Sequence, residues 1–247
     1  MSSLQGKVVL ITGGTKGIGR AIAHRVANAG ASVIVNYSRD ASAADEVVSS
    51  IGADRALAVQ ADVSSVPGIA RLVDAAVARF GRIDVLVPNA GIMPLQDLEH
   101  TTEATFDMAY ALNVKGPFFL AQRAAPHMGA GARVIFVSTG IARSSAVPPP
   151  YGLYASTKGA IEQLTRVLAK DLGRKGINVN AVAPGPTATE LFFAGKSEAM
   201  VKGIAGASPF NRLGQPDEIA SVVAFLAGEE SSWVSGQILG ANGGSFV

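Results

Sequence analysis

The sequence predicts an α/β fold in which a doubly wound, mostly parallel sheet is flanked by helices. Short apolar runs that resemble strands alternate with longer runs whose apolar residues recur at helical spacing. This alternation is typical of β-α-β units, and strands that are apolar along their whole length indicate a sheet buried on both faces. No linker and no internal repeat is evident in the 247 residues, so we expect a single domain.

The first half of the chain is expected to contain four strands separated by three helices. The strands are placed at residues 8–11, 32–37, 56–60 and 83–87. The helices are placed at residues 18–29, 41–50 and 69–80. Gly30 and Gly81 directly follow the first and third helices, and glycine is the residue favoured just after a helix.

The second half is expected to add three strands and three helices, two of which are long. The strands are placed at residues 133–137, 177–182 and 237–239. The helices are placed at residues 103–128, 154–172 and 216–226. Pro117 lies inside the first of these helices and is expected to bend it, because proline has no N–H to donate. Ligands are expected beyond the carboxyl ends of the strands.

Composition and charge exclude several functions. Hydrophobic residues make up 48% of the chain, enough for one large core. The net charge is +2 without a block of like charges, so no nucleic acid and no membrane partner is expected. There is no cysteine, and the three histidines lack metal-ligand spacing, so no metal site is expected. Without a signal-peptide core or an apolar run of about 18 residues, we expect a soluble, cytoplasmic protein.

A glycine-rich turn follows the first strand and leads into the first helix. It reads Thr12-Gly13-Gly14-Thr15-Lys16-Gly17-Ile18-Gly19. Glycines allow a tight turn and a close approach to a pyrophosphate, and the N–H groups of a helix N-terminus attract anions. A tight turn with a purely structural role is the alternative, but the strand before it and the helix after it favour cofactor binding.

A tyrosine and a lysine lie four residues apart at the start of the helix expected over residues 154–172. Tyr154 and Lys158 therefore share one helix face. An ammonium beside a phenol lowers the pKa of the phenol from its usual value of about 10, which favours proton exchange near neutral pH. For an isolated pair, an ordinary half-buried tyrosine and a solvated lysine are the alternative, and the other motifs weigh against it.

These motifs together resemble the short-chain dehydrogenase/reductase family. The resemblance rests on the glycine turn, Asn89-Ala90-Gly91, Asn113 and Tyr154-x-x-x-Lys158, with Pro184-Gly185 and Asn242-Gly243-Gly244 extending it over the whole chain. It implies a Rossmann-type sheet of seven strands. It also implies reversible hydride transfer between a nicotinamide cofactor and a carbonyl or alcohol, with a small-molecule carbonyl substrate.

The end of the second strand predicts a preference for NADPH/NADP+ over NAD. The strand ends Asn36-Tyr37-Ser38-Arg39, without the carboxylate that usually accepts from the ribose hydroxyls of NAD. Arg39 and Lys16 could bind a 2′-phosphate, although both could also be solvated surface charges. Asp62 resembles the family residue that binds the adenine, and a helix N-cap is its alternative role.

The expected cofactor contacts combine these motifs. They are Gly13, Thr15, Lys16, Gly17, Ile18, Gly19, Asn36, Tyr37, Ser38, Arg39, Ala61, Asp62, Val63, Asn89, Ala90, Gly91, Tyr154, Lys158, Pro184, Gly185, Thr187 and Thr189. Among them, Thr187 and Thr189 are expected near the carboxamide or the diphosphate.

The resemblance assigns catalytic roles residue by residue. It makes Tyr154 the proton donor in carbonyl reduction and Lys158 the group that lowers its pKa and holds the nicotinamide ribose. Asn113 resembles the residue that anchors a proton-relay water, while a buried asparagine satisfied by neighbouring backbone is the alternative.

The serine that polarises the substrate oxygen in this family has no obvious counterpart. Relatives commonly carry it thirteen residues before the tyrosine, where this chain has Ile141. Counting along the fifth strand instead puts Thr139 in its place, with Ser138 just before it. Thr139 is the first choice because its hydroxyl has the donor and acceptor capacity of serine, and Ser138 is the second.

The residues expected around the substrate are mainly apolar or aromatic. They are Met93, Ile141, Tyr151, Pro186, Leu191 and Phe192. They suit a hydrophobic ketone or aldehyde. Residues 189–209 are expected to form a lid over this site, and a solvent-facing connecting helix is the alternative.

Two further functions stay open beside reduction of a hydrophobic carbonyl. One is a 3-oxoacyl-thioester reductase, which would need a basic patch for its acyl carrier; Arg123, Arg143 and Lys196 are the candidates. The other is a non-catalytic NADP-binding regulator, although such proteins tend to lose the Tyr–Lys pair. The resemblance also implies a homotetramer.

Overall fold

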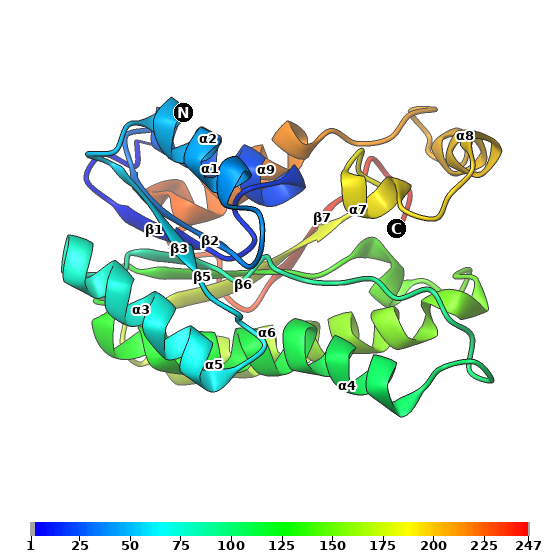
Figure 1. The fold of residues 1–247 in the computed structure, drawn as a ribbon, viewed down its shortest axis with the longest axis horizontal. Helices are drawn as coiled ribbons and strands as arrows, with labels where there is room; N and C mark the ends of the chain where they lie inside the picture. Colours follow the sequence, from blue (N-terminus) through cyan, green and yellow to red (C-terminus); the bar gives the residue numbers. More distant parts are fainter. Residues whose placement is uncertain (1–2, 247) are drawn as a thin grey trace.

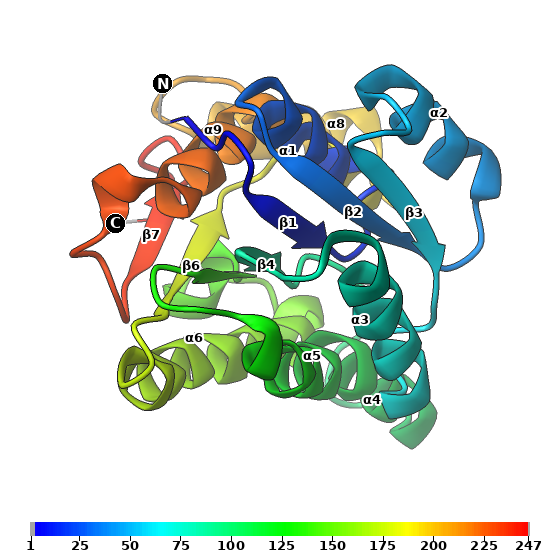
Figure 2. The same ribbon diagram turned by 90° about the vertical axis from the view of Figure 1, so that its left-hand side faces the viewer.

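Seven parallel strands form one sheet in the order β3-β2-β1-β4-β5-β6-β7. The structure is a computed structural model that describes residues 3–246. The strands are β1 (Val8–Ile11), β2 (Ser32–Tyr37), β3 (Ala56–Gln60), β4 (Val85–Val87), β5 (Arg133–Val137), β6 (Asn178–Pro184) and β7 (Ile238–Ala241). Figures 1 and 2 show the twisted sheet between two layers of helices. The predicted doubly wound α/β fold is confirmed.

Alternate residues of each central strand face opposite layers, as the pleat of a strand requires. In β1, Val9 and Ile11 belong to the core beneath α1 (Gly17–Asn28), α2 (Ala41–Ile51) and α9 (Pro216–Ala227). Val8 and Leu10 belong to the opposite core, beneath α3 (Val66–Phe80), α5 (Gly116–Ala124) and α6 (Gly152–Gly173). Both faces of the sheet are therefore buried, which explains why the central strands β1 and β4 are apolar along their whole length.

The long helix expected over residues 103–128 is interrupted in its middle. It consists of α4 (Glu103–Tyr110), a π-helical turn (Ala111–Lys115), α5 and a short 3₁₀ turn (Ala125–His127). Pro117 is the second residue of α5 and cannot donate a hydrogen bond to the carbonyl of Asn113. The irregularity expected at Pro117 thus takes the form of a wider turn just before it, and that turn contains Asn113.

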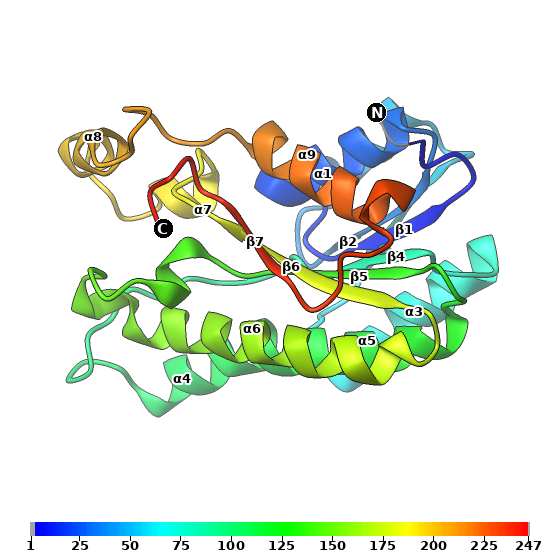
Figure 3. The ribbon, with the colours of Figure 1, turned by 180° about the vertical axis from the view of Figure 1, so that it is seen from behind.

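The carboxyl ends of the strands meet on one side of the molecule, together with α7 (Glu190–Phe193) and α8 (Glu198–Gly206) (Figure 3). The segment expected as a lid, residues 189–209, contains these two short helices. The strand order reverses between β1 and β4, and ligands of doubly wound sheets bind at such a reversal. No helix within the described residues is long and apolar enough to cross a membrane.

Candidate active site

A cavity of about 570 Å³ opens at the carboxyl ends of β1, β4, β5 and β6. Most of the predicted cofactor residues line it. These are Gly13, Lys16, Gly17, Ile18, Gly19, Asn89, Ala90, Gly91, Tyr154, Lys158, Pro184, Gly185, Thr187 and Thr189. The six predicted substrate residues and both hydroxyl candidates, Ser138 and Thr139, line the same cavity. The structure therefore brings together motifs that are distant in the sequence.

The glycine turn is shaped so that backbone alone faces the cavity. Gly13 and Gly17 have φ angles of 59° and 50°, in the left-handed region that glycine tolerates. A Cβ on Gly19 would collide with the carbonyl oxygen of Gly13 and lie 2.6 Å from Asn89 Nδ2. Side chains are therefore excluded at these positions, and the turn stays open to a close ligand.

Thr12 fixes the turn to the strand at which the order of the sheet reverses. Its buried hydroxyl accepts hydrogen bonds from the backbone N–H groups of Asn89 and Ala90, each at 3.0 Å. Asn89 returns the contact, since its Nδ2 donates to the carbonyls of Thr12 (2.9 Å) and Gly13 (3.1 Å). Thr12 belongs to the glycine-rich motif, but the sequence did not predict it as a site residue. Its contact with Asn89 and Ala90 joins β1 to the end of β4, and no local pattern marks such a contact.

Asn36 holds the turn from the other side and does not line the cavity. Its Oδ1 accepts from the N–H of Gly13 at 3.4 Å, and its Nδ2 donates to the carbonyls of Tyr37, Val59 and Ala61. The predicted cofactor contact of Asn36 is therefore an indirect one, because backbone groups occupy its polar atoms. Thr15 is likewise buried and outside the cavity lining.

The remaining predicted cofactor residues lie beyond the cavity, at the ends of β2 and β3. Those strands pair in parallel and bring residues 37–39 beside residues 61–63. Ser38, Arg39 and Asp62 are exposed, whereas Ala61 and Val63 are buried. Asp62 Oδ1 accepts hydrogen bonds from the hydroxyl and N–H of Ser64, which lower the pKa of Asp62. Ser65, rather than Asp62, caps the following helix.

Lys16 carries a positive charge at the same edge. Its Nζ lies 2.8 Å from Asp40 Oδ2 and 3.7 Å from Glu190 Oε2. The hydrogen bond and charge of Asp40 raise the pKa of Lys16 above its usual value. Asp40 also caps α2 through the N–H of Ala43, so the carboxylate nearest to Arg39 in the sequence is already paired.

Thr139, rather than Ser138, is the hydroxyl that contacts the tyrosine. Its side chain is close enough to Tyr154 to lower the pKa of the phenol. The hydroxyl of Ser138 instead donates to Glu162 Oε1 at 3.2 Å. Consecutive residues of an extended chain point to opposite sides, which explains why these two neighbours have different partners.

The expected lowering of the Tyr154 pKa is wrong for the protein alone. Burial raises the pKa of Tyr154 to about 12, and the hydrogen bond with Thr139 only partly offsets this effect. Burial disfavours a phenolate because the charge loses its hydration. The phenol therefore remains protonated near neutral pH.

Lys158 is the buried cation beside Tyr154. Its Nζ lies 5.8 Å from the centre of the Tyr154 ring and donates to the carbonyl of Val137 at 2.7 Å. Burial lowers the pKa of Lys158 to about 8. The nearest polar partner of the ammonium is therefore a backbone carbonyl, and desolvation is the largest influence on the pKa of the phenol.

Asn113 supports this site without lining the cavity. It is fully buried; its Oδ1 accepts from the N–H of Ile92, while its Nδ2 donates to the carbonyl of Ile92 and to Thr157 Oγ1. The side chain is satisfied by neighbouring groups, as the alternative for this residue predicted. These bonds fix Asn113 against the segment that carries Ile92, and a Cβ on Gly91 would lie 3.1 Å from its Oδ1. The predicted water-anchoring role of Asn113 stays a prediction.

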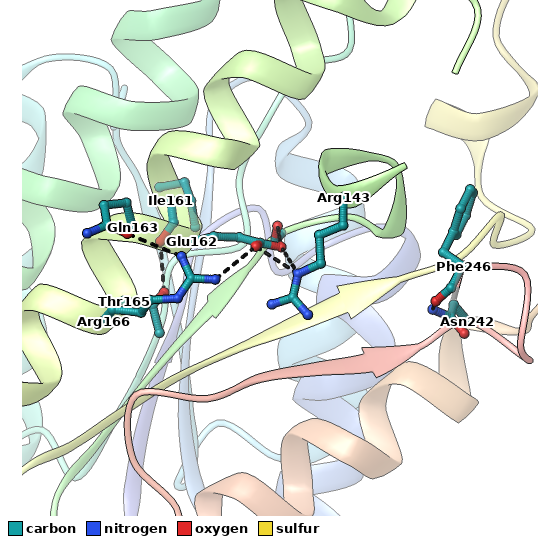
Figure 4. Close-up of polar contacts among 9 residues, drawn as sticks. Arg143, Ile161, Glu162, Gln163, Thr165, Arg166, Asn242 and Phe246 are labelled. Atoms are coloured by element: carbon teal, nitrogen blue, oxygen red, sulfur yellow. Dashed lines mark hydrogen bonds and ion pairs between the residues drawn. The ribbon is translucent and has the colours of Figure 1, made fainter. Parts of the chain in front are cut away.

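A buried carboxylate behind Thr139 was missed from the sequence. Glu162 is 5% exposed and accepts hydrogen bonds from Ser138 and Arg143, and Arg166 pairs with it at 3.4 Å (Figure 4). Glu162 lies eight residues after Tyr154 on α6, about two turns along the same face. That spacing is the only sequence feature that could have placed Glu162 near the site.

The substrate end of the cavity is apolar and aromatic, as expected. Tyr151 and Phe192 contribute rings, and burial raises the pKa of Tyr151. Ile204 of α8 and Phe246 also line it, and neither was predicted. No sequence motif marks them, because they reach the cavity through the path of the chain after β6 and β7.

The residues present fit a nicotinamide dinucleotide. Lys16, the residue before α1, makes no side-chain capping hydrogen bond, so the first N–H groups of this helix are left for an anion. The backbone in front of them lacks side chains at Gly13, Gly17 and Gly19. Among residues 3–246, no three His, Cys, Asp or Glu side chains are grouped to hold a metal ion.

Similar proteins share the whole architecture. A family model described as Enoyl-(Acyl carrier protein) reductase matches residues 13–245. Elsinochrome reductase 1 from Elsinoe fawcettii is 42% identical, with 100% of this chain and 97% of that protein covered. Hydroxynaphthalene reductase-like protein Arp2 from Metarhizium acridum (strain CQMa 102) is 42% identical, with 99% of this chain and 97% of that protein covered.

A solved structure matches equally well. It is a short chain dehydrogenase from Burkholderia cenocepacia J2315 in complex with NADP, with a TM-score of 0.93, 37% identity and 98% of each chain covered. The parallel sheet, the glycine turn at its reversal and the Tyr–Lys pair on α6 define a Rossmann-type oxidoreductase. The chain belongs to the short-chain dehydrogenase/reductase family.

Proposed function

We propose that this protein reduces a hydrophobic ketone or aldehyde to the alcohol with NADPH, and that Tyr154 donates the proton. The observation that carries the proposal is that Tyr154, Thr139 and Lys158 line one largely apolar cavity, in which Thr139 is close enough to Tyr154 to lower the pKa of the phenol. This arrangement offers a carbonyl oxygen two hydroxyl groups with a cation close behind them.

NADP would lie along the glycine turn, with its 2′-phosphate near the end of β2. Lys16, Ser38 and Arg39 would bind that phosphate, because charge-assisted hydrogen bonds favour a dianion and no unpaired carboxylate faces them at Asp40. The complex of the Burkholderia relative with NADP supports this assignment. The bound cofactor would supply the hydride that reduces the carbonyl carbon.

The proton chemistry follows from the pKa values of the two buried groups. Tyr154, with a pKa of about 12, is protonated at neutral pH, and its O–H bond breaks as the proton passes to the substrate oxygen. Lys158, with a pKa of about 8, is still an ammonium at that pH and stabilises the phenolate left behind. Thr139 donates to the same substrate oxygen and orients it.

A flat aromatic ketone is the substrate that suits the cavity best. Three rings line its substrate end, on Tyr151, Phe192 and Phe246, and aromatic rings favour offset stacking or edge contacts with other rings. The relative named hydroxynaphthalene reductase-like protein carries a fused aromatic compound in its name, which supports this class.

The alternative of a 3-oxoacyl-thioester reductase finds less support. Its expected basic patch is engaged elsewhere: Arg123 pairs with Asp74 at 2.6 Å, Arg143 with Glu162 at 2.8 Å, and Lys196 donates to the carbonyl of Phe192. The matching family model is nevertheless described as an acyl-carrier-protein reductase. For this reason a thioester is included among the substrates of the experiment below. A non-catalytic regulator is the weakest alternative, because the Tyr–Lys pair is buried and intact.

A homotetramer in the cytoplasm stays a prediction. Exposed apolar side chains on α4, α5 and α6 and the 99% exposed Trp233 before β7 are the surfaces expected to pair. Light scattering on the purified protein would give the mass directly, and a monomer would contradict the expectation.

Oxidation of NADPH, followed spectrophotometrically, tests the proposed function. The substrates are 1-tetralone, cyclohexanone, benzaldehyde and an acetoacetyl thioester. We expect turnover of 1-tetralone to exceed that of the thioester. Exclusive turnover of the thioester would establish the alternative, and NADPH binding without any turnover would support a regulator.

A further inference from the structure

The chain turns back after β7, and the ring of Phe246 lines the cavity. Gly243 and Gly244 have φ angles of 58° and 75°, which reverse the backbone directly after Asn242. Asn242 fixes the turn, because its Nδ2 donates to the carbonyl of Phe246 at 2.9 Å and its Oδ1 accepts from the N–H of Gly244 at 3.0 Å (Figure 4). Phe246 is thereby held beside the substrate end of the cavity, which it lines.

The ring of Phe246 lies directly on Gly140. A Cβ added to Gly140 would collide with the ring, with Cγ and Cε2 each at 2.9 Å and Cδ2 still nearer. Gly140 does not have a positive φ, so its backbone would accept alanine. The aromatic ring is therefore the reason that this position needs glycine.

This contact is one residue away from the reacting groups. Gly140 follows Thr139, which lines the cavity together with Tyr154. From behind, Glu162 holds the same segment through Ser138 and Arg143. The polypeptide that presents the Thr139 hydroxyl is thus clamped between a carboxylate on one side and the Phe246 ring on the other.

The turn also contacts the end of the segment expected to act as a lid. A Cβ on Gly243 would lie 3.1 Å from the ring of Phe210, and one on Gly244 would lie 3.4 Å from Pro209. Both residues follow α8, which contributes Ile204 to the cavity. The turn that carries Phe246 therefore packs against two separate segments, one at Gly140 and one at Pro209 and Phe210.

We propose that Phe246 is a specificity-determining residue, whose ring forms the wall against which a flat aromatic ketone stacks and which excludes substrates that are bulky on that side. This role rests on the proposed reductase function. Removing the ring should remove the stacking contact, which lowers kcat/KM for an aromatic substrate by about 3- to 10-fold. It should affect a small aliphatic ketone less, because that substrate has no ring to stack.

A double-mutant cycle tests the role with 1-tetralone and cyclohexanone as substrates. Phe246→Ala should lower the ratio of kcat/KM for 1-tetralone over that for cyclohexanone by about 3- to 10-fold. Gly140→Ala should lower the ratio similarly, because its methyl group takes the place of the ring. The double variant should be no worse than either single variant. Additive losses, or an unchanged ratio in Phe246→Ala, would overturn the proposal.

A second measurement needs no turnover and separates this proposal from the proposed function. Trp233 is the only tryptophan, so Trp233→Phe removes the background fluorescence, and Phe246→Trp in that variant reports on the wall. Acrylamide should quench this tryptophan several-fold less efficiently than Trp233 in the wild-type protein. Adding Gly140→Ala should abolish the protection. If acrylamide reaches the tryptophan at position 246 fully in the variant that still has Gly140, residue 246 does not form a wall of the cavity. That result would overturn the proposal whatever substrate the enzyme reduces.

Discussion

The ammonium of Lys158 lies 5.8 Å from the centre of the Tyr154 ring, and it is bound to the carbonyl of Val137. Both residues belong to α6, and desolvation moves their pKa values apart, to about 8 for the lysine and about 12 for the tyrosine. In each case burial favours the uncharged form. At neutral pH the buried ammonium of Lys158 therefore costs stability, which supports the catalytic role that we propose for it.

Lys158→Met should stabilise the fold at neutral pH while abolishing turnover. Below pH 8 the folded protein must keep a buried ammonium, so its cost is fully present. Between pH 8 and the unfolded pKa of 10.5 the folded state loses that proton first, and the stability of the wild-type protein rises with pH. The advantage of Lys158→Met should therefore shrink by about 2 to 3 kcal/mol from pH 7 to pH 10.

Urea unfolding of both proteins at pH 7 and pH 10 measures this change. Taking the difference between the two proteins removes the contribution of Tyr154, whose raised pKa costs stability only above pH 10. A difference that stays constant with pH would show that Lys158 is not buried as a cation.

Arg39→Asp should reverse the cofactor preference. The guanidinium is exposed at the end of β2, where a carboxylate would repel a 2′-phosphate and accept from ribose hydroxyls. We expect the ratio of kcat/KM for NADPH over NADH to fall by at least about tenfold, the size of one charge-assisted hydrogen bond. Arg25→Asp, a change of the same charge within α1, is the control and should leave the ratio unchanged. A ratio unaffected by Arg39→Asp would disprove the phosphate contact.

Thr139→Ala and Ser138→Ala should differ strongly in kcat. The hydroxyl of Thr139 contacts Tyr154, and removing one donor to a reacting oxygen costs about 10²-fold. The hydroxyl of Ser138 contacts Glu162, so its loss should lower kcat by less than about tenfold. Thr139→Ser should retain most of the activity. Equal losses in the two alanine variants would mean that the roles are shared or exchanged.

Glu162→Gln should destabilise the fold by about 1 to 3 kcal/mol, because Ser138 and Arg143 lose a charged acceptor in a buried site. For a chain of this size, such a loss lowers Tm by about 2 to 12 °C. Asp74→Asn is the matched control: Asp74 pairs with Arg123, but both side chains are half exposed, so the change should stay within about 0.5 kcal/mol. Thermal unfolding measures the Tm of both variants. If Tm falls by a similar amount in both, Glu162 is no more important for stability than an exposed ion pair.

Much of the fold could be predicted because it depends on local patterns. The bounds of β1, β2, β3 and β5 agree with the expected strands, since continuous apolar runs between glycines leave little choice. The π-helical turn at Asn113 could not be predicted, because it is tied to Ile92 and Thr157, which are distant in the sequence. Propensity carries no information about such contacts.

The site shows the same division. Spacing along one helix brought Tyr154 and Lys158 together correctly, but the pKa of the phenol was misjudged because it depends on burial by the whole fold. The choice between Ser138 and Thr139 needed the direction of each side chain. Phe246 needed the path of the chain beyond β7, which no motif encodes.

Tyr154→Phe tests the central claim most directly. NADPH affinity, measured by fluorescence titration, should change little, because the variant removes one oxygen and leaves the glycine turn and the other expected cofactor contacts in place. The rate of 1-tetralone reduction should fall by about 10²- to 10⁴-fold, the usual contribution of a positioned proton donor. Turnover close to that of the wild-type enzyme would contradict the account.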